Sequence, residues 1–219
     1  LILSFEPLLR VAGIEEPRRE LLQLLSNLLQ EPMARLLTRL DDSLTPQQTE
    51  AFTKLAERRA AREPLSYITG TVYFAGLELA VGPGVLVPRP DSEVLVEKAV
   101  ELAQEIYADK KARQTEEANL NLLDTCTGSG AIGIAIARQL KDAGIPVLLH
   151  LLDQSPEALD YARRNSERWC SDLPVLIELG DLFPAEPLVF DFITANPPYI
   201  TDSVLPELMP EVSCYEPAL

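Results

Sequence analysis

The sequence has 219 residues, of which 47% are hydrophobic and 24% charged, and this composition suits a globular protein with one or two packed cores. It holds no apolar run near the ~20 residues that span a bilayer and no visible signal peptide, so we expect a cytoplasmic protein with no membrane partner. Its three cysteines are scattered and lack metal-ligand spacing, so we expect reduced thiols and no metal site. The net charge of −15 lies almost wholly in residues 71–219, which hold 10 Lys and Arg against 24 Asp and Glu, and this acidity disfavours a nucleic-acid partner.

Residues 1–62 are predicted to form a helical domain. Leucines recur at i, i+3, i+4 and i+7 spacing after Pro17, and Thr45 and Pro46 have the residue types of an N-cap and a first helical position. Nothing in this region looks catalytic. We therefore expect a small helical bundle whose role is to dock a partner.

Residues 63–90 are predicted to be a connector that contains a β-hairpin. The residues that favour strand are Tyr67, Ile68, Val72, Tyr73 and Phe74, and the turn signals are Gly76 and the run Gly82-Pro83-Gly84.

Residues 91–219 alternate between helical and strand patterns, which indicates an α/β domain. The expected helices are 92–107, 130–143 and 155–169, and the expected strands are 119–124, 145–153, 173–181 and 190–196. This alternation predicts a parallel sheet that is covered on both faces. Ligands of such sheets bind at the carboxyl ends of the strands, near the point where the strand order reverses.

The turn after the first of these strands carries a G-x-G-x-x-G pattern at Gly128, Gly130 and Gly133. The pattern alone is weak, because it also fits a dinucleotide whose pyrophosphate lies at the helix N-terminus. Asp124 ends the strand directly before the turn, where its carboxylate repels a diphosphate and can face a cationic ligand group; alternatively it only caps the turn. Asp153 ends the next strand, where a carboxylate can accept both hydroxyls of a ribose.

These features predict an adenosine-containing ligand that carries an amino group rather than phosphates, and S-adenosylmethionine fits this description. Asp181, which follows the third strand, is either a ligand near the adenine or a plain turn residue. The single histidine, His150, lies inside an apolar strand, so we expect a structural role for it.

The fourth strand runs into Asn196-Pro197-Pro198-Tyr199, next to the same predicted pocket. Each proline has a fixed φ and no N–H, and each residue before a proline is driven to an extended conformation. The Asn196 side-chain oxygen and the Pro197 backbone oxygen can then both accept hydrogen bonds from a planar NH2 group. Such acceptors would aim the nitrogen lone pair at a methyl sulfonium, with Tyr199 as a flat wall over the group.

At this point the sequence resembles class I S-adenosylmethionine-dependent methyltransferases that modify planar amino nitrogens. It is most similar to the HemK/PrmC family, the protein-(glutamine-N5) methyltransferases that act on translation release factors. The motifs that carry the resemblance are "DTCTGSG" (124–130), Asp153, "NPPY" (196–199), "EPLSYITG" (63–70), "VPRPDSE" (87–93) and "YEPAL" (215–219). They cover roughly residues 60–219, whereas residues 1–62 match only in size and character.

The resemblance implies a substrate, which is the glutamine of the Gly-Gly-Gln motif in a peptide chain release factor. It implies three domains: a helical docking domain (1–62), a connector (63–90) and a methyltransferase domain (91–219). It also implies site residues. The cofactor would be held by Asp124, Thr125, Cys126, Thr127, Gly128, Gly130, Asp153, Asp181 and Asn196. The substrate would be held by Asn196, Pro197, Pro198 and Tyr199, with Pro88, Arg89, Pro90 and Asp91 from the connector and with Glu216-Pro217.

Two departures from the family pattern stand out. Cys126 occupies the place of the first glycine of the turn, where a small residue is tolerable if its φ stays negative. The family's sheet continues after "EPAL" with roughly three more strands, so we expect the native protein to be longer than this chain.

Four alternatives remain. A ribosomal-protein glutamine methyltransferase shares Asn196–Tyr199, although its connector usually reads Pro-Arg-Ser-Pro rather than "PRPD". An adenine-N6 nucleic-acid methyltransferase needs the same acceptor pair, but also a basic groove. An NAD-dependent oxidoreductase explains the glycines but not Asn196–Tyr199. A non-catalytic adaptor with a degenerate nucleotide fold would have no need of Asn196.

Overall fold

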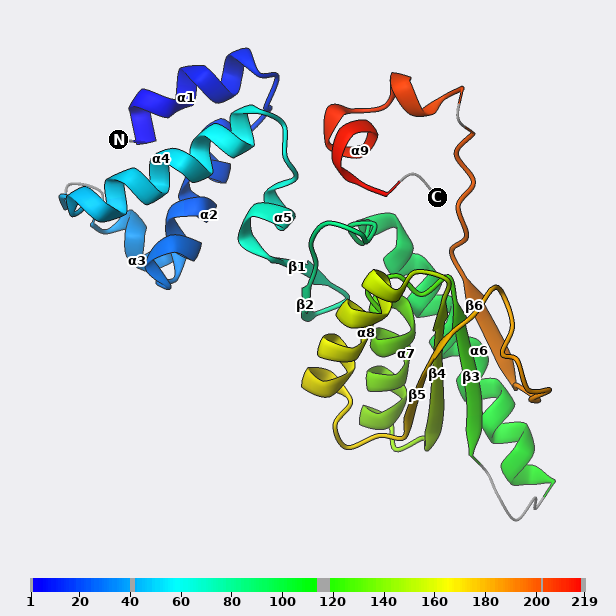
Figure 1. Ribbon diagram of the computed structural model, residues 1–219. Coiled ribbons are helices and arrows are strands. Elements are labelled where there is room, and N and C mark those ends of the chain that lie inside the picture. The colour runs from blue at the N-terminus through cyan, green and yellow to red at the C-terminus, as the bar shows by residue number, and fades with distance from the viewer. Residues whose placement is uncertain (1, 40–41, 114–118, 202, 218–219) are drawn as a thin grey trace. The chain divides into compact units, whose positions relative to one another are not determined.

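The computed structural model describes residues 2–39, 42–113, 119–201 and 203–217 (Figure 1). These residues form two compact units. The helical unit comprises residues 2–70 and 203–215, and the sheet unit comprises residues 71–201 and 216–217. No helix among the described residues is long and apolar enough to cross a membrane.

The helical unit contains the helices α1 (Ile2–Val11), α2 (Pro17–Leu29), α3 (Met33–Leu37), α4 (Pro46–Ala60), α5 (Leu65–Thr69) and α9 (Pro210–Tyr215) and the 3-10 turn η2 (Leu205–Glu207). The Leu21, Leu24 and Phe52 side chains are buried in its core. Thr45 forms a capping box with Gln48 at the start of α4, which confirms the predicted N-cap.

Tyr67 and Ile68 differ from their predicted strand conformation. Both lie in α5, a short helix that starts after Pro64 and ends at Gly70, where φ is 78°. Both side chains are buried. Burial against the rest of the unit therefore outweighs the preference of these residue types for strand.

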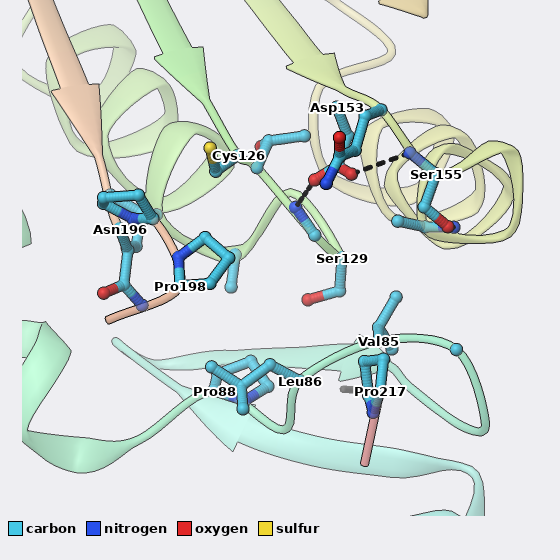
Figure 2. Close-up of a pocket in the computed structure, with 18 of the residues that line it drawn as sticks. Val85, Leu86, Pro88, Cys126, Ser129, Asp153, Ser155, Asn196, Pro198 and Pro217 are labelled. Carbon is cyan, nitrogen blue, oxygen red and sulfur yellow. Dashed lines mark hydrogen bonds between the residues drawn. The ribbon is translucent and has the colours of Figure 1, made fainter. Parts of the chain in front are cut away.

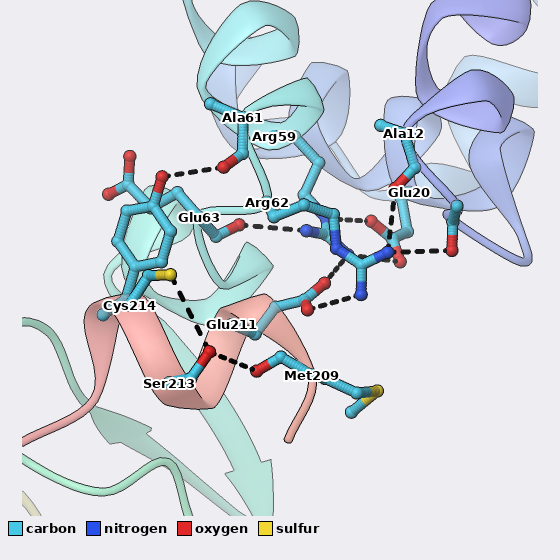
Figure 3. A network of polar contacts seen from close by, with 12 residues as sticks. Ala12, Glu20, Arg59, Ala61, Arg62, Glu63, Met209, Glu211, Ser213 and Cys214 are labelled. Carbon is cyan, nitrogen blue, oxygen red and sulfur yellow. Dashed lines mark hydrogen bonds and ion pairs between the residues drawn. The ribbon is translucent and has the colours of Figure 1, made fainter. Parts of the chain in front are cut away.

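Helix α9 is held to the N-terminal helices by a polar network (Figure 3). The Glu211 carboxylate accepts hydrogen bonds from Arg59 at 2.9 Å and from Arg62 at 2.5 Å. Arg59 also pairs with Glu20 of α2, and the Tyr215 hydroxyl donates to the backbone oxygen of Ala61 at 2.8 Å. Residues near the C-terminal end of the sequence thus complete the helical unit, which the sequence pattern did not predict.

The sheet unit begins with an antiparallel hairpin of β1 (Thr71–Phe74) and β2 (Leu77–Ala80), followed by the 3-10 turn η1 (Pro90–Ser92). The elements after it are α6 (Glu93–Ala112), β3 (Leu120–Thr125), α7 (Ala131–Asp142), β4 (Val147–Asp153), α8 (Pro156–Trp169), β5 (Val175–Leu179) and β6 (Phe192–Ala195). The four later strands are parallel in the order β5-β4-β3-β6, which confirms the predicted α/β fold with a Rossmann-like sheet.

The three helices of this unit form one layer. Helix α7 packs on β3 and β4, α8 packs on β4 and β5, and α6 lies beside α7. The opposite face of the sheet carries Leu176 and Ile193, which are half-exposed, and His150, whose ring packs edge-to-face on Phe190 in the loop before β6. The expectation that helices cover both faces is therefore met on one face only, because α6, α7 and α8 all pack on the same side of the described sheet.

Candidate active site

A cavity lies at the carboxyl ends of the parallel strands, where the order of the strands reverses between β3 and β6 (Figure 2). Its walls come from the glycine turn after β3, the ends of β4, β5 and β6, and the connector after β2. The lining residues that the sequence predicted are Pro88, Arg89, Cys126, Thr127, Gly128, Asp153, Asp181, Asn196, Pro197, Pro198 and Pro217.

The glycine turn contributes backbone rather than side chains to the cavity. Gly128 has a φ of 56°, and a Cβ added there would meet no other atom within 4 Å, so the cavity reaches directly to the main chain. Gly130 is the N-cap of α7 with a φ of 80°. A Cβ on Gly133 would lie 2.8 Å from Asp124 and from Leu151, so this glycine allows the helix to pack closely on the sheet.

Cys126 adopts a left-handed conformation. Its φ is 53°. The expectation that a small non-glycine residue is tolerated here because its φ stays negative is therefore wrong. The left-handed region costs roughly 1–2 kcal/mol for a residue with a Cβ. Burial raises the pKa of the Cys126 thiol, so the thiol stays protonated at the edge of the cavity.

Asp124 does not line the cavity. It is 1% exposed, and its carboxylate accepts hydrogen bonds from the Thr127 hydroxyl at 2.5 Å, the Thr194 hydroxyl at 2.7 Å and the Gly133 N–H at 3.0 Å. Burial raises the pKa of Asp124, and these three donors oppose that shift only in part. The carboxylate thus links the turn to β6 and α7 on the side away from the cavity.

Asp153 ends β4 and faces the cavity. Its two carboxylate oxygens accept one backbone hydrogen bond each, from Gly128 N at 2.8 Å and from Ser155 N at 3.0 Å (Figure 2). A carboxylate oxygen has two lone pairs, so both oxygens retain an acceptor site for a ligand. The Ser155 hydroxyl, and not Asp153, accepts the N-cap bond of α8 from Ala158.

The tip of β6 brings Asn196, Pro197 and Pro198 to the cavity, with Asn196 half-buried. Tyr199 is 81% exposed and is not among the residues that line the cavity. The structure therefore places Asn196 and Pro197 at the cavity but leaves the aromatic side chain of Tyr199 in solvent.

The connector supplies the opposite wall through Val85, Leu86, Pro88 and Arg89, whereas Pro90 lies in η1 and outside the lining. Glu216 also lies outside the lining.

The Glu216 carboxylate is buried, with a side-chain exposure of 2%, and it accepts hydrogen bonds from Val87 N at 3.3 Å and from Arg89 at 2.5 Å. Glu216 therefore supports the wall, and the next residue, Pro217, lines it.

The charged lining residues are Arg89, Asp153 and Asp181, so the described part of the wall carries more negative than positive charge. Thr125 is buried and does not line the cavity. Sequence reasoning missed Gln154 and Leu182, which line the cavity, and Asn165, which braces it. The positions next to Asp153 and Asp181 could have pointed to the first two, whereas no sequence signal marks Asn165.

The comparisons with known proteins agree with this geometry. Residues 93–209 match the family model of the methyltransferase small domain, and residues 1–70 match that of the PrmC N-terminal domain. The fold and site therefore define a member of the methyltransferase small-domain family.

Two relatives narrow the family further. The release factor glutamine methyltransferase of Geobacter sulfurreducens is 41% identical over 94% of this chain, which covers 66% of that protein. The enzyme of the same name from Mycolicibacterium smegmatis is 35% identical over 96% of this chain, which covers 68% of that protein. This chain belongs to the family of release factor glutamine methyltransferases, and it spans about two thirds of the length of these relatives.

Among solved structures, a putative class I S-adenosylmethionine-dependent methyltransferase from Listeria monocytogenes matches 93% of this chain and 61% of its own, at 13% identity and a TM-score of 0.41. The tRNA (uracil-54, C5)-methyltransferase of Pyrococcus abyssi matches 58% of this chain and 28% of its own, at 22% identity and a TM-score of 0.41. Scores this low add nothing to the fold described above.

Proposed function

We propose that the protein transfers a methyl group from S-adenosylmethionine to the side-chain nitrogen of the glutamine in the Gly-Gly-Gln motif of a translation release factor. The observation that carries this proposal is the position of Asn196 and Pro197, two adjacent acceptors at the wall of a cavity that also contains the glycine turn and Asp153. Membership in the release factor glutamine methyltransferase family supports the choice of substrate.

The residues of the cavity fit S-adenosylmethionine. The space open in front of Gly128 admits a ligand against the main chain, and Asp153 retains acceptor sites suited to ribose hydroxyls. The excess of carboxylates over cations in the lining suits a ligand with a sulfonium and an ammonium better than one with a diphosphate. In this proposal Asp181 contacts the adenine, and Asp124, Thr125, Cys126, Thr127 and Gly130 form or support the turn.

When bound, the cofactor supplies an electrophilic methyl group. The contribution of this chain is to orient the acceptor. In this proposal the Asn196 side-chain oxygen and the Pro197 backbone oxygen accept the two N–H groups of the glutamine amide, which favours a pyramidal nitrogen whose lone pair points into the cavity. An amide nitrogen that has gained a fourth bond is strongly acidic, so it loses its proton without a strong base.

The rigid backbone around these acceptors matters as much as their chemistry. Asn196 and Pro197 each precede a proline and are thereby restricted to extended conformations. The Pro197 backbone oxygen, held in this way, loses little entropy when it binds the amide, and the Asn196 side chain projects from a restricted backbone. In this proposal Pro198, Tyr199, Arg89 and Pro90 contact the residues around the glutamine.

We further propose a division of labour along the chain. Residues 1–62 would dock the release factor, residues 63–90 would form the connector at the substrate side, and residues 91–219 would carry the cofactor and the chemistry. Because its substrate acts in translation termination, the protein would work in the cytoplasm, without direct contact to nucleic acid.

A methyl-transfer assay tests this function. The full-length protein is incubated with labelled S-adenosylmethionine and either a release factor or its Gln→Ala variant at the Gly-Gly-Gln motif. Label in the first acceptor only is the expected result. Equal label in both would refute the choice of the acceptor residue.

Absence of label with S-adenosylmethionine still bound would refute the substrate and keep the cofactor. A ribosomal protein and an adenine-containing nucleic acid would then be the next acceptors to try. Preference for NAD over S-adenosylmethionine would refute the cofactor and point to the oxidoreductase alternative, whereas failure to bind either ligand would point to an adaptor.

A further inference from the structure

Asn165, on helix α8, joins three parts of the sheet unit. Its side-chain amide nitrogen donates to the backbone oxygens of Ser129 at 2.8 Å and of Ala80 at 3.0 Å, and its side-chain oxygen accepts from the N–H of Ala80 at 2.7 Å. Asn165 is 1% exposed. A single buried side chain therefore links α8, the end of β2 and the glycine turn.

Only an amide side chain satisfies this arrangement. The three bonds need two donors and one acceptor, and in the reverse orientation the amide oxygen would face two carbonyl oxygens. Both backbone groups of Ala80 are bonded to the side chain of Asn165, which thus pairs with β2 as a neighbouring strand would. Aspartate has the same shape but lacks the two donors.

Helix α8 and the hairpin make further contacts away from the turn. The Trp169 ring N–H donates to the backbone oxygen of Glu78 at 2.9 Å, and Arg168 pairs with the Glu78 carboxylate at 2.5 Å. A Cβ on Gly82 would lie 2.3 Å from the Tyr161 hydroxyl, so the chain after β2 passes directly against α8. Of these contacts, only the one at Asn165 also reaches the glycine turn.

On the β4–α8 side, two side chains hold the turn. Asp153 binds the N–H of Gly128, and Asn165 binds the carbonyl of Ser129, the next residue. Both Gly128 and Ser129 line the cavity, and so do Val85 and Leu86 of the connector that continues from β2. If the bond to Ser129 is lost, the turn keeps only one of these two side-chain anchors on the β4–α8 side.

We propose that Asn165 is a positioning residue that fixes the glycine turn against the connector and so sets the width of the cofactor cavity. It acts through the backbone of Ser129 and Ala80 and does not contact the cofactor. This inference rests on the proposed binding of S-adenosylmethionine. Its consequence is that cofactor affinity depends on a residue outside the cavity.

The test compares Asn165→Ser, whose side chain is too short to reach both backbones, with Trp169→Phe, which removes one bond between α8 and the hairpin but none to the turn. Both are made in the full-length protein, and thermal unfolding, S-adenosylmethionine affinity and amide hydrogen exchange are measured. We expect Asn165→Ser to raise the dissociation constant of S-adenosylmethionine about ten-fold, which corresponds to the free energy of about one buried hydrogen bond. Trp169→Phe should lower the Tm and leave affinity within about two-fold.

Hydrogen exchange in the ligand-free protein is the second readout. The Gly128 N–H should exchange faster in Asn165→Ser than in Trp169→Phe at equal loss of Tm. Equal exchange and equal affinity in the two variants would overturn the proposal, since Asn165 would then be only a stabilising residue.

The exchange readout also separates this inference from the proposed function. If the unmodified protein does not bind S-adenosylmethionine, the proposed function fails, and the exchange rate of Gly128 still decides whether Asn165 positions the turn. If Asn165→Ser does not fold, Asn165→Gln replaces it, because it keeps both amide donors and the acceptor but displaces them by one methylene from Ser129 and Ala80.

Discussion

The Arg89 guanidinium and the Glu216 carboxylate form an ion pair of 2.5 Å between residues that are 127 positions apart in the chain. The same carboxylate accepts the N–H of Val87 at 3.3 Å. Arg89 lines the cavity while Glu216 is buried behind it, so the two residues have different roles although the sequence analysis assigned both to the substrate.

This pair yields a first prediction. Glu216→Ala leaves the N–H of Val87 unsatisfied and frees Arg89, so it should lower stability by about 1–3 kcal/mol and raise the KM for the acceptor. Glu216→Gln keeps a neutral acceptor and should lose roughly half as much. Thermal unfolding and acceptor titration check both variants. An equal loss of stability in the two variants would show that the hydrogen bond from the Val87 N–H does not contribute to stability.

The second prediction concerns Asn196. Asn196→Ala removes one of the two acceptors proposed for the amide, so methyl transfer should fall by about 100-fold or more, as for the loss of one oriented transition-state hydrogen bond. S-adenosylmethionine affinity should change little. Single-turnover rates and equilibrium binding measure the two effects separately. Equal loss of binding and rate would contradict the assigned role.

The third prediction concerns Asp153. Asp153→Ala removes the proposed ribose acceptor and the anchor of Gly128 N–H, so cofactor affinity should fall about 10- to 100-fold. Asp160→Ala, on the exposed face of α8 and paired with Arg163, is the matched control and should bind as the unmodified protein does. An unchanged affinity in Asp153→Ala, measured by calorimetry, would rule out the ribose contact.

The fourth prediction uses the raised pKa of Asp124, whose main cause is burial. A carboxyl group whose pKa is higher in the folded state than in the unfolded state loses its stabilising contribution as the pH rises through the folded pKa. Asp124→Asn cannot ionise, so its Tm relative to the unmodified protein should improve as the pH rises above the unfolded pKa, near 3.9. Asp124→Ala leaves the Gly133 N–H and the Thr127 hydroxyl without this acceptor, and the Thr194 hydroxyl with only the Leu123 carbonyl at 3.5 Å, so it should cost about 3 kcal/mol or more at acid and at neutral pH.

A Tm difference between Asp124→Asn and the unmodified protein that stays constant with pH would refute this account of Asp124. Asp109, an exposed carboxylate of α6 that pairs with Arg113, provides the control substitution Asp109→Asn.

The fifth prediction concerns α9. Burial alone acts to raise the pKa of Glu211, but the hydrogen bonds from Arg62 and Arg59 outweigh it, and that pKa is lowered. A carboxylate with a lowered folded pKa stabilises the fold above its unfolded pKa, near 4.3, and this contribution is lost as the pH falls through the folded value. The Tm difference between the unmodified protein and Glu211→Gln should therefore be present at neutral pH and vanish in acid.

Glu50→Gln is the matched control for Glu211→Gln, because Glu50 pairs with Lys54 on the exposed face of α4 and belongs to the same unit. It should change the Tm little at any pH. A pH-independent effect of Glu211→Gln would mean that the ion pairs with Arg59 and Arg62 do not hold α9.

Regular patterns account for the parts of the fold that the sequence predicted. The leucine spacing in α2, the N-cap at Thr45 and the alternation from α6 to β6 are local signals that tertiary packing did not override. The cavity was predictable too, because glycines after one strand and Asp153 after the next must meet at the same edge of a parallel sheet.

The remaining features depend on contacts that no local pattern encodes. The carboxylate of Asp124 points behind the turn because three donors surround it there. Asn165 resembles an ordinary polar residue in the sequence, and its partner Ser129 lies 36 positions away. Glu216 was expected at the site, but its pairing with Arg89, 127 positions away, was not. Tyr67 and Ile68 entered a helix because burial outweighed their intrinsic preference.

The path of the chain after β6 limits how the protein can be divided. The backbone enters the sheet unit after Gly70, leaves it after Thr201, and returns at Glu216. A cut at residue 70 would therefore not release a free-standing helical module, since α9 would lose Arg59 and Arg62 and remain attached to Glu216 and Pro217 at the cavity wall. For the same reason, an evolutionary exchange of residues 1–70 for an unrelated domain would have to replace the segment 203–215 as well.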